Sequence, residues 1–297
     1  MFSCIKSICN KSICKNSPIL RSIGNIRQIS KLIQYELIKQ LGEGATSVVY
    51  KVLNKEEKKF YTCKILSVEK KIEVHREVRV LKKLSGYHFP KFKELFCTEK
   101  EMHILTDFIE GEELFKHINN TFLYKNTIDF KKVGQYALEM ASIIKTLYSL
   151  GFIHLDIKME NFIQLSDDPI TLKLIDFGTA HPIIDEMAKT DTTVGTLGYS
   201  PLEIYKNHYH PNSDVWSLGI IIWILITRSP PFNHSEIPLE FTDSFPISRF
   251  MFPLDHHNEL KTLMPQETFD LFCRIFELFP EDRVSIDDIL NHKPFAT

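Results

Sequence analysis

The sequence predicts an α+β fold in which a small antiparallel sheet with one helix precedes a larger, mainly helical part. Strand-like alternation begins at Leu37, and an apolar helical stripe follows at Val74, Val78 and Leu81. The apolar run "LGIIIWILI" at residues 218–226 is too short to span a bilayer and is typical of a buried helix. With 43% hydrophobic residues among 297, the chain can form one large core or two modest ones.

The first strands surround a glycine-containing turn. The stretch "LIKQLGEGATSVVYKVL" predicts two strands on either side of residues 42–47, where two glycines allow the backbone to approach a ligand closely. After the polar turn "NKEE", the run "KKFYTCKIL" predicts a third strand that carries Lys64. The sheet therefore presents a glycine-rich turn and a lysine on neighbouring strands.

The predicted helix carries an acidic residue beside its apolar stripe. Glu77 lies three residues after Val74 and four before Leu81, at the border of the face expected to meet the core. A carboxylate in that place needs a partner or access to water. Two interpretations follow: Glu77 turns to solvent among its basic neighbours, or it pairs with Lys64.

A second hairpin is predicted where "FIQL" and "LKLI" flank the turn "SDDPIT". The two strands pair naturally when residue numbers sum to 337, which places Asn161 opposite Asp176. Two oxygen-bearing side chains placed together are suited to a hard divalent cation. The alternative is that both are ordinary turn residues.

Charge is distributed unevenly along the chain. Residues 1–35 contain six Lys or Arg and no acidic residue, and the remainder holds 30 basic and 38 acidic side chains, a net charge of −8. Residues 1–34 are therefore set apart as a basic N-terminal tail. The mildly acidic body predicts no binding to nucleic acid.

The tail leaves three interpretations open. Lysines interrupt its apolar residues before a secretory signal could form, and Cys4, Cys9 and Cys14 are spaced by five. It is a mobile basic segment, a serine-rich and acid-poor transit peptide, or a segment whose cysteines are acylated for membrane attachment.

The remaining cysteines indicate a reducing compartment. Cys63, Cys97 and Cys273 fall among apolar residues and are expected to be reduced core thiols. Cytoplasmic location is the prediction, with organelle targeting or membrane association through the tail left open. No transmembrane segment is predicted.

From about Tyr35 to Phe295 the sequence resembles a eukaryotic-type protein kinase, because its motifs occur in the order of that family. The resemblance implies a bilobal kinase fold over residues 35–297, with a small lobe at about 35–108 and a large lobe at about 109–297. The matching segments are "GEGATSVV" with Ser47 in place of the third glycine, "YTCK" with Lys64, Glu77, "HLDIKMEN" at 154–161, Asp176-Phe177-Gly178, "GTLGYSPLE" ending at Glu203, "SDVWSLG" around Asp214 and "FPEDRVSIDDIL" around Arg283.

The resemblance implies ATP and Mg²⁺ as cofactors and gives the site residues their roles. Lys64 would grip the α- and β-phosphates and Glu77 would orient it, while Asn161 and Asp176 would hold magnesium. In the catalytic loop, Asp156 would accept the proton of the substrate hydroxyl. Lys158 would steady the phosphoryl group in transfer.

The nucleotide would lie against the glycine-rich turn, the sheet and the segment that connects the lobes. Thr62 stands where the family usually has alanine, so its extra hydroxyl and branch are expected to weaken ATP binding without abolishing it. The implied contacts are Leu41, Gly42, Glu43, Gly44, Ala45, Thr46, Ser47, Val49, Thr62, Lys64, Thr106 as gatekeeper, Asp107, Ile109, Glu113 at the ribose and Ile163.

The expected substrates are proteins with serine or threonine acceptors. Lys158 and Thr196 match the serine/threonine branch of the family, in which the threonine hydroxyl meets the catalytic aspartate and lysine. Glu113 and Glu160 match acids that receive an upstream arginine in some relatives, or they are solvated surface acids. Ile224 replaces a further acid, which argues against a strict double-arginine motif.

Leu155 stands where many kinases have an arginine that binds a phosphate on the activation segment. Leucine cannot make that contact. The hypothesis is that phosphorylation of Thr190, Thr192 or Thr193 does not switch the enzyme on, and that it is constitutively competent or controlled by a protein partner.

Two rival functions belong to other classes. Ser47, Thr62 and Leu155 depart from the family and keep open a kinase-fold scaffold without transfer activity. A small-molecule kinase is disfavoured by the long activation segment and by the anchors at Asp214 and Arg283.

Overall fold

The computed structural model describes residues 33–44, 46–84, 86–121, 129–183, 188–190, 195–232 and 263–296. Several predictions lie outside these residues: those on the tail to residue 32 with its three cysteines, on Ala45, and on Thr192 and Thr193. No helix within the described ranges combines the length and the apolar character that a membrane crossing requires.

The described chain divides into two compact units. The smaller contains residues 33–78 together with 92–108, and the larger contains residues 79–91 and everything described from 109 onward. Each unit has its own sheet or sheets and its own buried side chains. They are considered separately below.

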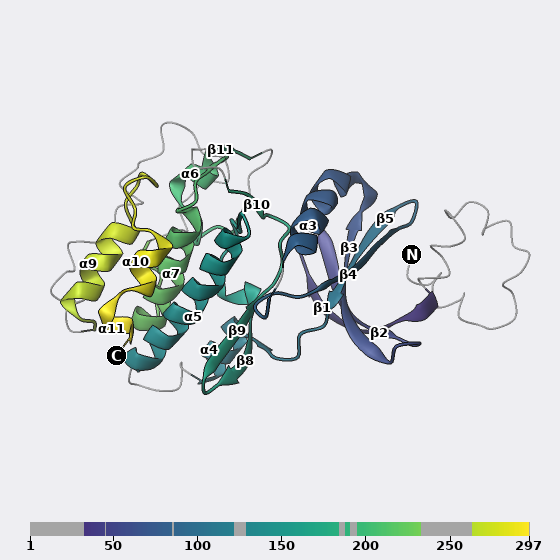
Figure 1. Cartoon of the computed structure of the whole chain (residues 1–297), viewed down its shortest axis with the longest axis horizontal. Helices are drawn as coiled ribbons and strands as arrows, with labels where there is room; N and C mark the ends of the chain where they lie inside the picture. The colour runs from purple at the N-terminus through teal and green to yellow at the C-terminus, as the bar shows by residue number, and fades with distance from the viewer. Residues whose placement is uncertain are drawn as a thin grey trace, which may run out of the picture. The chain divides into compact units, whose positions relative to one another are not determined.

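The smaller unit is built on an antiparallel sheet with strand order β1-β2-β3-β5-β4 (Figure 1). Strands β1 and β2 are joined by the glycine-rich turn, and β3 lies at the centre between β2 and β5. The bounds are β1 Tyr35–Glu43, β2 Ser47–Asn54, β3 Lys59–Ser67, β4 Phe92–Cys97 and β5 Glu101–Asp107, and β3 leads into η2 Val68–Lys70 and α3 Lys71–Lys83.

The alternation of β3 gives the sheet two different faces. One face carries Tyr61 and Cys63, which pack with Val52, Phe96 and Leu105 in a buried cluster. The opposite face carries Lys64. Helix α3 covers this second face, since its Glu77 bonds to Lys64.

The predicted stripe of α3 is buried, as expected for its core-facing side. Val74 is fully buried, and Val78 and Leu81 are almost so. Ile72 lies on the outer side and is 75% exposed. The 3.6-residue period therefore predicted the orientation of this helix correctly.

The larger unit is mainly helical, as the sequence predicted. Its short strands form the ladders β6-β8-β9, β7-β10 and β11-β12. The bounds are β6 Glu112–Glu113, α4 Leu114–Thr121, α5 Phe130–Ser149, β7 Phe152–Ile153, η3 Met159–Asn161, β8 Phe162–Asp167, β9 Ile170–Leu174, β10 His181–Pro182, β11 Ala188–Lys189, α6 Leu202–Tyr205, β12 His208–Tyr209, α7 Ser213–Thr227, α9 Gln266–Ile275, α10 Ile286–Leu290 and α11 Lys293–Ala296.

Helices α5 and α7 pack against each other in the core of this unit, with α10 and α11 against α5 and α9 against α7 (Figure 1). The apolar run lies within α7, which is buried on almost every side. Gly219 is required there, because a Cβ atom on it would come within 2.4 Å of the Ile275 side chain. Trp216 stacks on Phe232 and meets Phe276 edge-on.

Cys63, Cys97 and Cys273 are free thiols, as predicted, but only Cys63 lies in the core. Cys63 is buried in the sheet cluster, and burial raises its pKa to about 12. Cys97 and Cys273 are only partly buried. Cys97 is the last residue of β4, and Cys273 lies in α9 between the fully buried Phe272 and the exposed Arg274.

Candidate active site

In the smaller unit, Lys64 and Glu77 form an ion pair between β3 and α3. Lys64 Nζ donates to both carboxylate oxygens of Glu77, at 3.0 Å each. The side chains are 14% and 5% exposed, so the solvent interpretation of Glu77 is wrong and the pairing interpretation holds. The lysine keeps some access to water.

The glycine-rich turn closes on itself at the end of β1. The amide of Gly44 donates to the carbonyl of Ser47 at 2.8 Å, and a Cβ atom on Gly42 would meet nothing within 4 Å. Glu43, Gly44, Thr46 and Ser47 line a cavity of about 570 Å³ together with Ile65 to Ser67 and residues of η2 and β5. The turn thus presents backbone and hydroxyl groups beside open space.

The predicted base-binding residues of this unit lie on adjacent strands. Thr62 pairs with Thr106 between β3 and β5, and Val49 pairs with Lys64 between β2 and β3. Leu41 on β1 is 42% exposed. Asp107 accepts a hydrogen bond from Lys59 at 2.7 Å, so its side chain is engaged within the sheet.

In the larger unit, three polar side chains converge on Asp156. Thr196 Oγ1 donates to Asp156 Oδ1 at 2.6 Å, and Lys158 Nζ lies 2.9 Å from Asp156 Oδ2. Lys158 also donates to Thr196 Oγ1 at 2.7 Å, which closes a triangle of contacts. Asn161 Nδ2 donates to the carbonyl of Asp156 at 2.8 Å and to its Oδ2 at 3.2 Å.

A buried carboxylate holds the backbone before Asp156. Asp214 is fully buried and accepts hydrogen bonds from the amides of His154 and Leu155, each at 2.8 Å. Leu155 has φ of 66°, a left-handed conformation that leucine rarely adopts without such support. Burial raises the pKa of Asp214, while the two amides and His154 act in the opposite direction.

Asp176 also has a left-handed backbone, with φ of 60°, and its Oδ1 accepts the amide of Gly178 at 3.1 Å. Phe177 next to it is fully buried between two rings, His154 at 5.3 Å and Phe89 at 5.8 Å between centroids. This packing fixes the direction in which the chain leaves β9.

The predicted register of the second hairpin is wrong at this end. Phe162 pairs with Leu174, and the amide of Ile175 donates to the carbonyl of Asn161. Asn161 therefore lies opposite Ile175, one residue short of Asp176. The cause is a register shift between Gln164 and Ser166, since an extra residue on one strand displaces all later pairs.

Glu113 and Ile163 are brought together, because β6 pairs with β8 at these two residues. Lys116, one turn further along, donates to Glu113 Oε2 at 2.8 Å. Ile109 is described near the start of this unit and is partly buried. The sequence did not indicate that Glu113 has a lysine partner.

The donor chemistry at Asn161 and Asp176 fits magnesium. Asn161 directs its Nδ2 at Asp156, which leaves its amide oxygen for a cation. The part of the chain that is described contains no cluster of three or more His, Cys, Asp or Glu side chains suited to a metal ion. Magnesium needs no such cage, since it is usually held by one or two protein oxygen ligands together with substrate phosphates.

Glu203 and Arg283 form a buried scaffold pair, with the arginine donating to the two carboxylate oxygens at 2.5 and 2.9 Å. Their side chains are 5% and 0% exposed. Arg283 also donates to the carbonyls of Glu277 and Leu278. It anchors the end of the predicted activation segment to the loop before α10.

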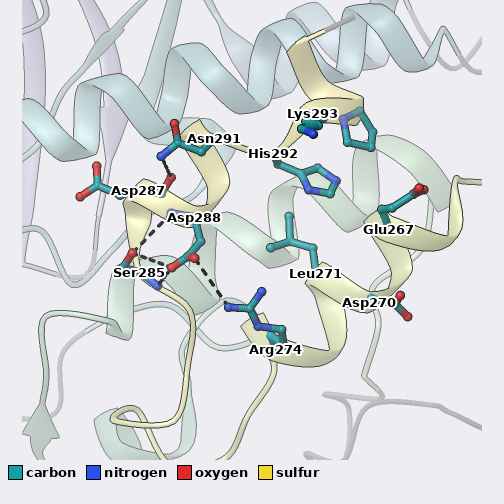
Figure 2. Close-up of a pocket in the computed structure, with 11 residues that line it drawn as sticks. Glu267, Asp270, Leu271, Arg274, Ser285, Asp287, Asp288, Asn291, His292 and Lys293 are labelled. Atoms are coloured by element: carbon teal, nitrogen blue, oxygen red, sulfur yellow. Dashed lines mark hydrogen bonds and ion pairs between the residues drawn. The ribbon is translucent and has the colours of Figure 1, made fainter.

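A second hollow, of about 520 Å³, lies among α9, α10 and α11 and contains no predicted site residue (Figure 2). Part of its charged lining is engaged: Arg274 lies 3.6 Å from Asp288, which also accepts bonds from the amide and hydroxyl of Ser285. The side chain of His292 lies 3.1 Å from the hydroxyl of Thr268. This arrangement is typical of helix capping.

The family model described as protein kinase domain matches residues 35–295. The chain belongs to the protein kinase family. It is 28% identical over 266 residues to calcium-dependent protein kinase 27 of Arabidopsis thaliana, covering 87% of this chain and 54% of that protein. It is 29% identical over 285 residues to serine/threonine-protein kinase cds1 of Schizosaccharomyces pombe, covering 89% and 58%.

A third relative, calcium/calmodulin-dependent protein kinase type IV of Mus musculus, is 36% identical over 202 residues, which is 67% of this chain and 42% of that protein. The chain thus spans about half the length of the curated relatives it matches. What is shared with them is the kinase domain, with its bilobal α+β fold.

Two residues of this region were missed by the sequence analysis. Tyr148 of α5 is partly buried, its hydroxyl donates to the carbonyl of Pro211 at 2.6 Å, and it lies beside Asp214. Phe89 packs on Phe177. No local pattern marks either residue, since each acts through a contact that is distant in sequence.

Proposed function

We propose that the chain transfers the γ-phosphoryl group of ATP to serine or threonine hydroxyls of proteins. The observation that carries this proposal is the triangle of Asp156, Lys158 and Thr196, which places a carboxylate, an amine and a hydroxyl within hydrogen-bond distance of one another. Such a group can orient an incoming hydroxyl and counter the charge of a phosphoryl group.

Asp156 is proposed as the group that receives the substrate proton. In the transfer, the acceptor oxygen forms a bond to the γ-phosphorus while the bond to the β,γ-bridging oxygen breaks, and ADP leaves. The proton of the acceptor hydroxyl passes to Asp156. Lys158 stands beside that carboxylate and neutralises the equatorial oxygens of the phosphoryl group.

Lys64 is proposed to hold the α- and β-phosphates. Glu77 fixes the lysine by bonding it through both oxygens, so the amine is oriented before the nucleotide arrives. The backbone of residues 42–47 approaches the phosphates, with Ser47 in place of a glycine. The base contacts are proposed as Leu41, Val49, Thr62, Thr106, Asp107, Ile109, Glu113 and Ile163.

Asn161 and Asp176 are proposed as the magnesium ligands, through the free amide oxygen and the carboxylate. When bound, magnesium would neutralise charge on the phosphate oxygens. The chain's part is to hold the two ligands: Asn161 is fixed by its bonds to Asp156, and Asp176 by the amide of Gly178.

A serine or threonine acceptor is proposed because the hydroxyl of Thr196 donates to Asp156 and because one relative is named a serine/threonine-protein kinase. Phosphoamino-acid analysis of a labelled generic acceptor protein tests this. Label on tyrosine alone would contradict it. Strong preference for an upstream arginine is not proposed, since Glu113 is already paired with Lys116.

We further propose that the activity does not depend on phosphate in the activation segment. Leu155 is 4% exposed in an apolar cluster and offers no cation to a phosphate. The enzyme is then constitutively competent or controlled by a protein partner. Phosphatase treatment should leave the transfer rate nearly unchanged, and a large drop would refute this proposal.

Transfer of labelled γ-phosphate from Mg-ATP to a generic protein tests the activity, comparing the wild type with Asp156→Asn. The variant should lose about 10²- to 10⁴-fold in rate. The matched control is Asp270→Asn on α9, which should retain the wild-type rate. A scaffold without activity gives no phosphate transfer in the wild type or in Asp156→Asn. A small-molecule kinase leaves the protein acceptor unlabelled.

The domain limits and location are also proposals. The kinase domain is assigned to residues 35–297, after a basic tail, with lobes at about 35–108 and 109–297. Cytoplasmic location is tested by imaging a fluorescent fusion with and without residues 1–34. Movement of the full-length fusion to an organelle or membrane would instead support one of the alternatives for the tail.

A further inference from the structure

The residue before Asp156 lies in a buried apolar cluster. Ile153, Leu155, Ile204 and Tyr209 form it, and Tyr148 and Ile183 pack against it. These side chains come from β7, the catalytic loop, α6 and β12, as well as from α5 and the segment after β10. Elements that are distant in sequence are therefore joined at Leu155.

Tyr209 is the member of this cluster that also makes polar contacts. It is 3% exposed, and its hydroxyl donates to the carbonyl of Pro182 at 3.1 Å. Its ring centroid lies 5.2 Å from that of His181. Its backbone pairs with Ala188 in the β11-β12 ladder.

Contacts around Tyr209 tie down two parts of the segment between Asp176 and Glu203. At its start, β10 pairs with β7, and the amide of Ile183 donates to the carbonyl of Gly151 at 2.9 Å. Further along, the amide of Thr190 donates to the carbonyl of Asn207 at 2.9 Å. Tyr209 touches both places through its hydroxyl and its strand.

The end of the same segment lies against Leu155. A Cβ atom on Gly195, whose φ is 85°, would come within 2.9 Å of the carbonyl of Leu155. Thr196 follows directly and bonds to Asp156 and Lys158. A shift of Leu155 or of the segment would therefore move Thr196 away from Asp156.

We propose that Tyr209 is a positioning residue that keeps residues 181–183, 188–190 and 195–196 in place, through Leu155 and Pro182, without a phosphate. This rests on the proposed kinase function and deepens it, because it names the contact that replaces an arginine and phosphate pair. Burial of apolar surface around Tyr209 stabilises the contact with the segment. The hydrogen bond from the Tyr209 hydroxyl to the carbonyl of Pro182 fixes the orientation of the ring.

The test compares phosphatase-treated wild type with Tyr209→Phe and Tyr209→Ala by amide hydrogen exchange. In Tyr209→Phe, the amides of Ile183 and Thr190 should exchange about 2- to 10-fold faster, as expected for the loss of one buried hydrogen bond. Tyr209→Ala should accelerate them further, because the ring contacts to Leu155 and His181 are lost as well.

The matched control is Tyr136→Phe, which removes another tyrosine hydroxyl of the same unit, one that donates to Asp167. It should leave exchange at Ile183 and Thr190 unchanged. Exchange in Tyr209→Phe equal to that of the wild type at these amides would overturn the proposal. The proposal would also be overturned if, in both Tyr209 variants, the amides of α5 and α9 exchanged faster to the same extent as those of Ile183 and Thr190. That result reports general destabilisation.

Kinetics separate positioning from a merely structural role. Tyr209→Phe should lower kcat for a protein substrate several-fold while KM for ATP stays unchanged, because the proposed phosphate contacts lie elsewhere. If Tyr209→Phe accelerates amide exchange but leaves kcat unchanged, the proposed effect of Tyr209 on phosphate transfer is wrong. If the wild type transfers no phosphate, the proposed function fails, and the exchange result still decides whether Tyr209 holds the segment.

Discussion

Two ion pairs, one in each unit, join a basic side chain to a buried glutamate but differ in how they are enclosed. Lys64 meets Glu77 with 14% of the lysine side chain exposed, whereas Arg283 meets Glu203 with none of the arginine exposed. Arg283 also satisfies its remaining donors on backbone carbonyls and lies over the ring of Trp216, 4.9 Å from its centroid. The arginine of the larger unit is closed to solvent, while the lysine of the smaller unit keeps some access to it.

The comparison teaches that the two ion pairs differ in solvent access, and on the proposed function this difference separates the phosphate-binding Lys64 from the scaffold residue Arg283. A planar guanidinium with every donor engaged suits a permanent contact, and a compact ammonium with residual exposure suits one that must also receive a phosphate. The two pairs should therefore respond differently to substitution.

Arg283→Met is expected to have the largest effect. It leaves the Glu203 carboxylate buried without its cation, which costs about 3–5 kcal/mol in the free energy of unfolding. Urea denaturation measures this. The matched control is Lys59→Ala, which breaks the more exposed pair with Asp107 and should cost at most about 1 kcal/mol. If Arg283→Met and Lys59→Ala lower the free energy of unfolding by similar amounts, the distinction between the buried and the exposed ion pairs is wrong.

Lys64→Met should separate activity from stability. We expect phosphate transfer to fall by about 10²- to 10³-fold, as for removal of one preorganised donor. The free energy of unfolding should fall less than in Arg283→Met, because Glu77 lies beside a partly open lysine site that water can enter. A greater loss of stability than in Arg283→Met would contradict the distinction drawn here.

Ser285→Ala tests a third carboxylate, which is half exposed. The Ser285 hydroxyl lowers the pKa of Asp288, so this group stabilises the fold above its ordinary pKa and loses that effect as pH falls through the lowered value. Loss of the cap should cost about 1 kcal/mol at neutral pH. Denaturation at several pH values should show the difference from wild type narrowing below about pH 4.

Thr62→Ala should have the smallest effect and should act on the ligand alone. Removing the hydroxyl and the branch is expected to lower KM for ATP by a few-fold with little change in the midpoint of urea unfolding. Initial rates at varied ATP concentration measure this. A KM that stays in the wild-type range would mean that Thr62 does not weaken nucleotide binding.

Much of the smaller unit could be predicted because its signals are local. The turn at 42–47, the strand with Lys64 and the stripe of α3 each follow from patterns within about a dozen residues. The partner of Glu77 could not be chosen from the helix alone, since the choice depends on the distance between β3 and α3. Only the ordered motifs favoured Lys64.

In the larger unit the errors come from geometry that a pattern does not carry. The irregularity between Gln164 and Ser166 is invisible in the alternation of the hairpin, yet it displaces Asn161 by one position. The surroundings of Leu155 depend on Ile204 and Tyr209, which are remote in sequence. The sequence revealed the missing charge at Leu155 but not what takes its place.

The left-handed backbone at Leu155, held by Asp214 and covered with hydrocarbon, has a consequence for how such a kinase is governed. On the proposed function, an apolar contact of this kind gives an upstream enzyme no group that it could modify reversibly. On the proposed function, output would then scale with the number of competent molecules, which synthesis and turnover of the polypeptide or a protein partner would set.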